Sequence, residues 1–419
     1  MFRLTILLAV AVVVWGCGAS KGSERIVLRI ASWGGAGDDS DAARIQREVY
    51  AEFERLHPNV EIQLENTPGP QDYVKKMLLS FVAKAEPDIM RLDASSAAVF
   101  INNGVLLDLT SKINGPNGIE LGDFFPNVVA IAKRGDAIYA IPIDFTPMVV
   151  YYNKEHFDKA GVPYPKFDWT WNDFLAAAKA LTKDGKYGYT FNNWMPGWLP
   201  WIWNNDADVF GENRKATGAA NSPQFVEGIT WLRDLVIVHK VAPSLSQLAS
   251  EGAPPFSHGE AAMETSGHWN LVGLANAPDI KLDQIGIVPI PVSRRGMQPK
   301  TVMYESGWSI GKNCRHADLA WEFIRYYTSQ EVQRKIQSTG IGICARRDIA
   351  TERANDPRER DFLRIVPTAV RPWGATIEEY NFVESEGQKA MDGVLKGGRD
   401  PMEAFTRFAE AVDRQMEKP

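Results

Sequence analysis

Residues 26–64 read IVLRIASWGGAGDDSDAARIQREVYAEFERLHPNVEIQL, which is a β-branched run, a loop, an amphipathic run and a second alternating run. The first run predicts a strand that ends near Trp33. Ser40 can cap a following helix that continues to about Leu56. Residues 60–64 alternate as a second strand. The stretch is therefore a strand–helix–strand unit.

The next segments repeat the unit. Residues 73–83 have a helical pattern, and residues 87–92 predict a third strand. Strands that alternate with helices form a parallel sheet covered by helices, and ligands bind at the carboxyl ends of such strands. Trp33 and Asp93 fall at two of these ends.

The rest of the chain predicts a second α/β lobe and a return to the first. A crossover between the lobes is expected near Asp144. The later predicted strands are 138–143, 148–152 and 307–311, and the later predicted helices are 171–182, 223–238, 317–337 and 401–417. A chain of 419 residues exceeds the size at which one hydrophobic core stops growing, which also favours two lobes.

The composition is that of an ordinary globular protein, with 45% hydrophobic and 23% charged residues. The formal net charge is −6, and acidic and basic residues are interspersed. Nucleic-acid binding needs clustered Lys and Arg, so no nucleic-acid partner is expected.

The N-terminus predicts export. Arg3 precedes an apolar run over residues 4–14, which is shorter than the ~20 residues that span a bilayer. Residues 1–16 are therefore expected to be a signal peptide. Gly16-Cys17 is similar to the bacterial lipobox, which implies a lipidated Cys17 and a tether over residues 17–25. An ordinary signal peptide with a chance cysteine is the alternative.

Residues for catalysis or cofactors are hard to find. The six His residues lack metal-binding spacing, so no metal is expected. The loop that starts at Gly34 lacks the third glycine of a dinucleotide fingerprint, and no cofactor is expected. Cys314 and Cys344 follow different elements, which favours two free thiols over a bridge. Paired carboxylates for glycan hydrolysis could come from Asp93, Asp144 and Glu305.

Aromatic and polar residues recur where the chain leaves a predicted strand or helix. With the motifs around them, they make the chain resemble the family 1 extracellular solute-binding proteins, which are the sugar receptors of ABC importers. The motifs that carry the resemblance are Trp33-Gly34, Pro87-Asp88-Ile89 with Leu92-Asp93, Tyr139-Ala140-Ile141-Pro142, Tyr151-Tyr152-Asn153-Lys154, Trp171-Asn172-Asp173-Phe174, Gly259-Glu260-Ala261-Ala262-Met263, Gly307-Trp308-Ser309-Ile310 and Ala320-Trp321-Glu322-Phe323-Ile324.

The resemblance implies a periplasmic-binding-protein type II fold, with two α/β lobes, a hinge and a ligand cleft between the lobes. The N-terminal lobe is expected to comprise residues 26–141 and 299–345. The C-terminal lobe is expected to comprise residues 142–298 and 346–419.

A sugar offers an apolar face and a rim of hydroxyls, which aromatic rings and carboxylates can bind. Of the cluster Trp194, Trp198, Trp201 and Trp203, at most two residues can face the ligand, and Trp198 is the candidate. The family implies platforms at Trp33, Trp269 and Trp308, hydroxyl acceptors at Asp93, Asp144 and Glu305, and further contacts at Gly34, Gly307 and Arg346. Simple packing is the alternative for each Trp, and helix capping is the alternative for Asp93 and Asp144.

The expected function is capture of a carbohydrate, an oligosaccharide or glycoside, by hinge closure and its delivery to an ABC permease. We expect a monomer on the outer side of a membrane, held by lipidated Cys17, with no enzymatic activity. A secreted glycan hydrolase or lyase and an adhesive lipoprotein are the alternatives.

Overall fold

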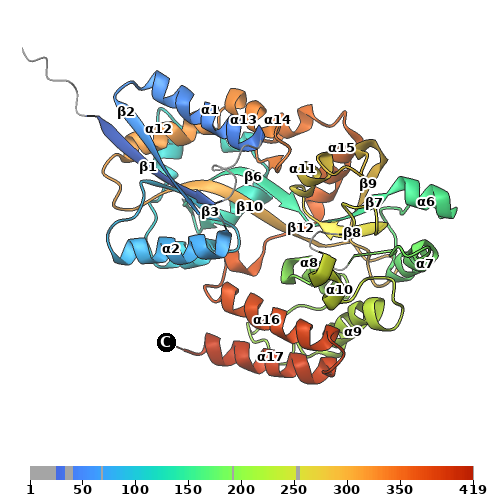
Figure 1. Ribbon diagram of the computed structural model, residues 1–419. Helices are drawn as coiled ribbons and strands as arrows, with labels where there is room; N and C mark the ends of the chain where they lie inside the picture. Colours follow the sequence, from blue (N-terminus) through green and yellow to red (C-terminus); the bar gives the residue numbers. More distant parts are fainter. Residues whose placement is uncertain (1–24, 34–40, 68, 191–192, 252–254, 419) are drawn as a thin grey trace, which may run out of the picture.

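The computed structural model describes residues 25–33, 41–67, 69–190, 193–251 and 255–418. Two sheets form its centre, one of seven strands and one of three (Figure 1). The predicted signal peptide, Cys17 with most of its tether, Gly34 and the Ser40 cap lie outside the described residues.

The seven-stranded sheet has the order β11-β6-β10-β3-β1-β2, with β12 paired to β10. Its strands are β1 (Ile26–Trp33), β2 (Val60–Thr67), β3 (Ile89–Asp93), β6 (Ile141–Pro147), β10 (Thr301–Ile310), β11 (Ile343–Cys344) and β12 (Ala369–Val370).

The predicted strand–helix repeat forms the parallel part of this sheet. β1 pairs in parallel with both β2 and β3. β10 is inserted between β3 and β6 and runs antiparallel to both, so the sheet is mixed rather than parallel throughout. The carboxyl end of β3 consequently meets the middle of β10, with Asp93 opposite Ser306.

Strands β6 and β10 each lie next to a connection between the two sheets. β6 continues almost directly into β7 (Val149–Asn153), the central strand of the three-stranded sheet. β7 pairs antiparallel with β8 (Met263–Ser266) and β9 (Ile285–Val288). The second connection is the start of β10, where Thr301 Oγ1 donates to the Met148 carbonyl at 2.5 Å. β4 (Lys133–Arg134) and β5 (Ala137–Ile138) form a small hairpin that is a separate two-stranded sheet.

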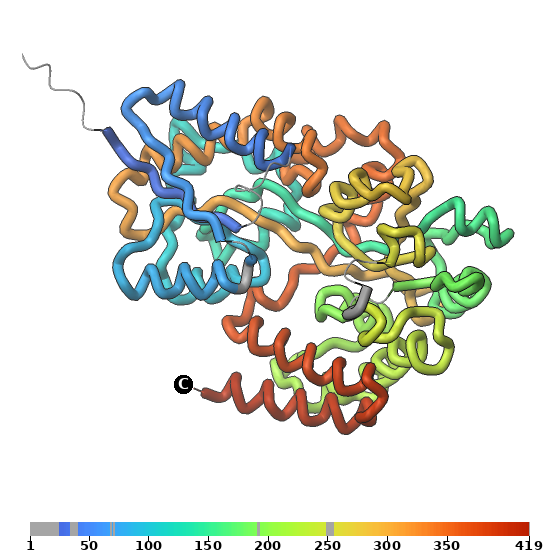
Figure 2. The backbone as a smooth tube through the Cα atoms, viewed as in Figure 1, coloured from blue at the N-terminus to red at the C-terminus, as the bar shows by residue number. Residues whose placement is uncertain are grey.

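Helices cover both sheets (Figures 1 and 2). Those associated with the seven-stranded sheet are α1 (Asp41–Leu56), α2 (Pro70–Val82), α3 (Ala97–Asn102), α4 (Thr110–Ile113), α5 (Pro126–Val129), α12 (Ala317–Tyr327), α13 (Gln330–Gln337) and α14 (Arg347–Glu352). The others are α6 (Lys154–Ala160), α7 (Trp171–Leu181), α8 (Met195–Trp203), α9 (Pro223–Ile237), α10 (Leu245–Glu251), α11 (Asn270–Ala275), α15 (Pro357–Ile365), α16 (Tyr380–Leu395) and α17 (Pro401–Met416).

Local sequence explains several helix ends. Thr170 and Asp173 form a capping box at the start of α7, and Ser222 caps α9 just before a proline at its first position. The single long helix predicted over 317–337 is two helices, α12 and α13. The break occurs because the Ser329 hydroxyl accepts the Val332 N–H and caps a new helix.

The path of the last segments differs slightly from the predicted lobe boundary. α14, predicted in the C-terminal lobe, packs against α13 and β11 at the seven-stranded sheet. The chain then passes to the other sheet, where α15 lies on β9 and α16 and α17 pack on α9. Figure 2 shows this final segment as the red end of the tube.

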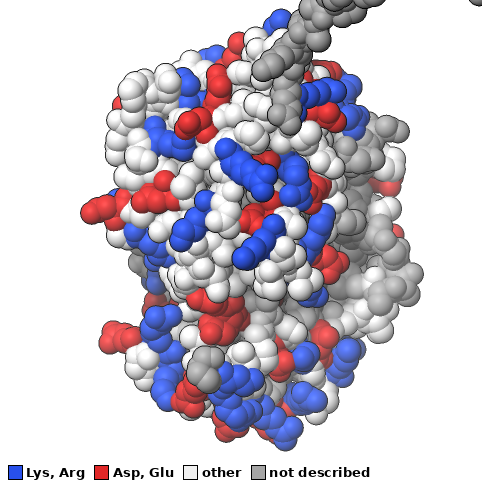
Figure 3. Space-filling model, turned by 90° about the vertical axis from the view of Figure 1, so that its left-hand side faces the viewer, with Lys and Arg blue, Asp and Glu red and all other residues white. Residues whose placement is uncertain are grey.

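The face seen in Figure 3 carries charges of both signs, and the two described cysteines are free thiols. Acidic and basic side chains are mixed on the face seen in Figure 3. Among the helices that the structure describes, none has the length and apolar character needed to cross a membrane. Cys314 and Cys344 are both free; the Cys344 thiol is 3.1 Å from Gln333 Oε1.

Candidate functional site

A cavity of about 460 Å³ lies between the two halves of the molecule. One wall comes from the seven-stranded sheet and includes Trp33 at the end of β1 and Asp93 at the end of β3. The other wall comes from segments beyond that sheet: Trp194 just before α8, Trp269 just before α11, and Glu384 on α16. The site therefore requires segments far apart in the sequence.

A polar network stiffens the wall formed by the sheet. Arg91 Nη2 donates to Asp144 Oδ2 at 3.0 Å and to Ser306 Oγ at 2.6 Å. The Ser306 hydroxyl in turn donates to Asp144 Oδ1 at 2.5 Å. The Arg91 guanidinium lies over the Trp33 ring, 4.5 Å from its centroid, and Tyr73 packs on the same indole with centroids 5.1 Å apart. Trp33 is consequently held in one orientation at the cavity edge.

Aromatic rings form the opposite wall. Trp194 stacks on Tyr304 with ring centroids 5.8 Å apart and an interplanar angle of 22°, and Trp269 meets Trp194 edge to face. The Trp194 indole N–H donates to Glu384 Oε1 at 2.7 Å. Flat apolar rings beside a carboxylate suit a ligand with an apolar face and hydroxyl groups.

Three carboxyl groups of the cavity are hard to ionise. Burial, together with the charges of Asp93 and Asp144, raises the pKa of Glu305 well above its ordinary value. Burial raises the pKa of Asp93 and outweighs the hydrogen bonds that it accepts from the Ser95 amide and hydroxyl. Burial and the charge of Asp93 raise the pKa of Glu384. Within the described structure Glu305 Oε1 has no hydrogen-bond partner, so it is available to a hydroxyl donor.

A buried ion network holds the segment that carries Trp269. His268 is fully buried, and its Nε2 lies 2.9 Å from Glu359 Oε2 while its Nδ1 lies 2.9 Å from the Gly340 carbonyl. The imidazole is thus fixed from both ring nitrogens, by the Glu359 carboxyl on one side and by the Gly340 carbonyl on the other. Glu359 Oε1 also pairs with Arg353 Nη2 at 2.8 Å. The His268 amide donates to Thr146 Oγ1 at 2.6 Å, which ties this segment to β6.

The structure brings six of the predicted site residues to one cavity. They are Trp33, Asp93, Asp144, Trp269, Glu305 and Trp308. Asp93 accepts hydrogen bonds from the Ser95 amide and hydroxyl, but it does not cap the following helix α3, whose N-cap is Ser96 without a side-chain cap bond. Trp308 borders the cavity but is not an open platform, because its side chain is fully buried and packs edge-on against Tyr327.

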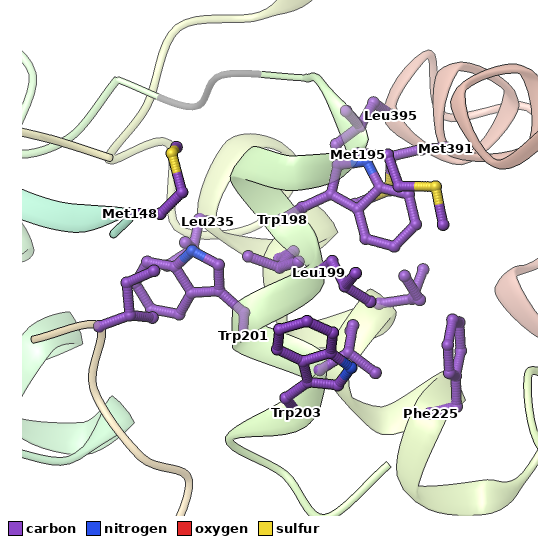
Figure 4. Close-up of a cluster of buried hydrophobic side chains, with 14 of the residues drawn as sticks. Met148, Met195, Trp198, Leu199, Trp201, Trp203, Phe225, Leu235, Met391 and Leu395 are labelled. Carbon is purple, nitrogen blue, oxygen red and sulfur yellow. The ribbon is translucent and has the colours of Figure 1, made fainter. Parts of the chain in front are cut away.

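Two predicted residues lie elsewhere. Trp198 does not line the cavity; it is fully buried and packs edge to face against Phe405. Figure 4 shows it among Met195, Met391 and Leu395. Every residue of α8 is buried, so the Trp198 indole lies in the hydrophobic core. Arg346 points away as well, because its guanidinium pairs with Asp123 at 2.7 Å and with Asp348 at 2.8 Å.

The two predicted glycines have different outcomes. Gly34 is outside the described residues. Gly307 is a backbone position of β10 that does not line the cavity, where a Cβ atom would lie 2.8 Å from the Ile141 carbonyl oxygen and 2.9 Å from Glu305 Oε1. Only glycine allows the two strands to approach this closely.

Sequence reasoning missed several lining residues. Arg91 is two residues before Asp93 on β3, and the two-residue period of a strand could have placed both on one face. Trp194, rather than Trp198, is the member of the Trp cluster that lines the cavity. Tyr380 and Glu384 lie one turn apart on α16, in a helix that no motif marked.

The sequence model of the family described as "Bacterial extracellular solute-binding protein" matches residues 36–334. An arabinooligosaccharide-binding protein of Halalkalibacterium halodurans is 28% identical over 209 residues, which cover 46% of this chain and 44% of that protein. The sn-glycerol-3-phosphate-binding periplasmic protein UgpB of Brucella abortus is 24% identical over 283 residues, 64% of each chain. The chain thus spans less than two thirds of the length of these relatives.

An ABC substrate-binding protein from Listeria monocytogenes, solved in complex with cycloalternan, has the same fold. The TM-score is 0.82 at 23% sequence identity, and the match covers 94% of this chain and 100% of the other. This agreement confirms the predicted fold class.

Proposed function

The chain belongs to the bacterial extracellular solute-binding protein family, and we propose that it captures a carbohydrate outside the cytoplasm and passes it to the permease of an ABC importer. The preferred solute is an oligosaccharide or glycoside. We expect the protein to bind it without chemical change, so the carboxyl groups of the cavity act as hydrogen-bond acceptors and not as catalysts.

One observation carries this proposal: aromatic rings and carboxyl groups converge on a single cavity from both halves of the molecule. Trp33 and Asp93 face it from the seven-stranded sheet, and Trp194, Trp269 and Glu384 face it from the other side. A sugar that stacks on the rings and donates hydroxyl hydrogens to the carboxylates would use both walls at once.

This two-sided site supports a closure mechanism. A solute that contacts both walls binds the closed form better than the open form and shifts the population toward closure. The lobes are centred on the two sheets, and we propose that the connection from β6 to β7 and the start of β10 act as the hinge. The permease would then recognise the closed form.

The proposed location and partners follow from the N-terminus and the family. Gly16-Cys17 after a short apolar run supports a lipid anchor that holds a monomeric receptor on the outer side of a membrane. The permease subunits and the lipid bilayer are the proposed partners.

Isothermal titration against a panel of neutral oligosaccharides tests the function, with the same mixtures analysed for product. We expect saturable, stoichiometric binding and an unchanged sugar. Release of shorter sugars would support the hydrolase alternative instead, and no heat with any sugar would count against carbohydrate capture.

Two exposed aromatic residues give a matched pair for this assay. Trp269 is 37% exposed in the cavity, and Tyr164 is 41% exposed outside it. Truncation of Trp269 to Ala should cost about 2 kcal/mol of binding, roughly a 30-fold rise in Kd. Tyr164→Ala should leave Kd unchanged. Equal effects of both changes would show that Trp269 does not contact the sugar.

A further inference from the structure

The charges that line the cavity are strongly unequal. Among the described lining residues, Asp93, Asp144, Glu305 and Glu384 can carry negative charge, and Arg91 is the single Lys or Arg. Phosphate and carboxylate recognition usually depends on Arg or Lys forks, so this is an unusual lining for an anionic solute.

Arg91 is already engaged by the protein. Its Nη2 pairs with Asp144 and bonds to Ser306, and its guanidinium face lies on Trp33. Asp144 therefore offsets the one positive charge. An anion at this wall would compete with a carboxylate that is already in place and hydrogen-bonded twice.

The three remaining carboxyl groups line the cavity from both of its walls. The charge of Asp93, on the sheet wall, adds to burial in raising the pKa of both Glu305 and Glu384. Glu384 lies on the opposite wall, with one oxygen bonded to the Trp194 indole. Both walls thus present acidic side chains to a bound solute, and the one basic side chain among the described lining residues is already paired.

We propose that this charge distribution selects against anionic solutes, so the cavity takes a carbohydrate without phosphate or carboxylate groups, and that Glu384 determines this specificity. The inference rests on the proposed function for the identity of the solute as a carbohydrate. Sugar hydroxyls can donate to all three carboxyl groups, whereas a phosphate group or the carboxylate of a uronate offers them only acceptors and would be repelled.

The sign of the potential can be measured without any sugar. Tryptophan fluorescence is quenched by acrylamide, which is neutral, and by caesium and iodide at constant ionic strength. Trp269 is the one exposed Trp among the described residues, so it should dominate the response to the ions. We expect caesium to quench better than iodide, after correction with acrylamide, and Trp269→Phe to remove most of this preference.

Charge variants on α16 test the role of Glu384. Glu384→Gln should lower the preference for caesium. Glu386→Gln, on the same helix but paired with Lys389 outside this cavity, should not. Thermal unfolding of both variants verifies that they fold. Equal preference in the wild type and in Glu384→Gln would overturn the assigned role.

Thermal-shift titrations complete the test with sn-glycerol 3-phosphate and trigalacturonate as anionic probes and maltotriose and arabinotriose as neutral probes. A rise in the melting temperature with either anionic probe, or stronger quenching by iodide than by caesium, would overturn the inference. Failure of every neutral sugar would instead count against carbohydrate capture and leave the measured sign of the potential standing.

Discussion

The substitution Glu359→Gln should destabilise the protein by removing a buried carboxylate that contacts the fully buried His268 and pairs with Arg353. The side chains of His268 and Glu359 are 0% and 4% exposed, and their charged atoms are 2.9 Å apart. Removing one partner of such a pair typically costs 3–5 kcal/mol, because the other charge stays buried without compensation. Glutamine keeps the shape and one acceptor, so we expect about 3 kcal/mol, the lower end of that range.

Urea unfolding at pH 7 measures this loss. The control is Glu331→Gln, which breaks the exposed pair between Glu331 and Lys335, whose side chains are 81% and 51% exposed. An exposed pair contributes about 0–1 kcal/mol, so the control should unfold almost as the wild type does. A loss in Glu359→Gln no larger than in the control would refute the ion network as a stabilising element.

The difference in unfolding free energy between the wild type and Glu359→Gln should depend on pH, and the pKa of Glu359 gives the direction of this dependence. Burial acts to raise the pKa of Glu359, but its hydrogen bond to His268 and the charges of His268 and Arg353 outweigh burial and lower it. A carboxyl whose pKa is lower in the folded state stabilises the protein above its unfolded pKa, about 4.3, and loses that contribution as the pH falls through the folded value. The gap between the wild type and Glu359→Gln should therefore shrink in acid. A gap that widens below pH 4 would contradict the assignment.

Three further outcomes are expected. Trp198→Ala should lower the free energy of unfolding by about 3–5 kcal/mol because it leaves a cavity in the core, yet the folded variant should retain the wild-type Kd for sugar. A loss of affinity without a loss of stability would show that Trp198 contacts the sugar. Cys17→Ser should move the protein from the membrane fraction to the soluble fraction, and unchanged fractionation would contradict the predicted lipid anchor. Sugar affinity should weaken as the pH falls through the raised pKa of Glu384, because the protonated acid is a poorer acceptor, and calorimetry should find that this dependence is smaller in Glu384→Gln.

Residues at strand ends were the most predictable part of the site. Trp33 and Asp93 end two strands of the predicted repeat, and parallel strands carry their ends to one edge of a sheet, so local pattern was sufficient to bring these residues together. Asp144 and Glu305 were also predicted and line the same cavity. Arg91 could have been added from strand alternation alone.

The choice among the Trp residues depended on packing. α8 is buried on all sides, so its sequence has no polar face to indicate which indole turns toward the cavity. Trp198 lies in the core, where it contacts Phe405 on α17, and Trp194 lies at the cavity, where it contacts Glu384 on α16. Both helices are about 200 residues away in the chain.

The sequence by itself determined the alternation of strands and helices and the polar and aromatic residues at strand ends, since each depends on neighbours within one or two turns of chain. Only the tertiary structure decided the antiparallel insertion of β10, the partner of Arg91 and the position of Glu384 opposite Asp93. These features depend on contacts between distant segments, where burial and charge, and not local periodicity, select the arrangement.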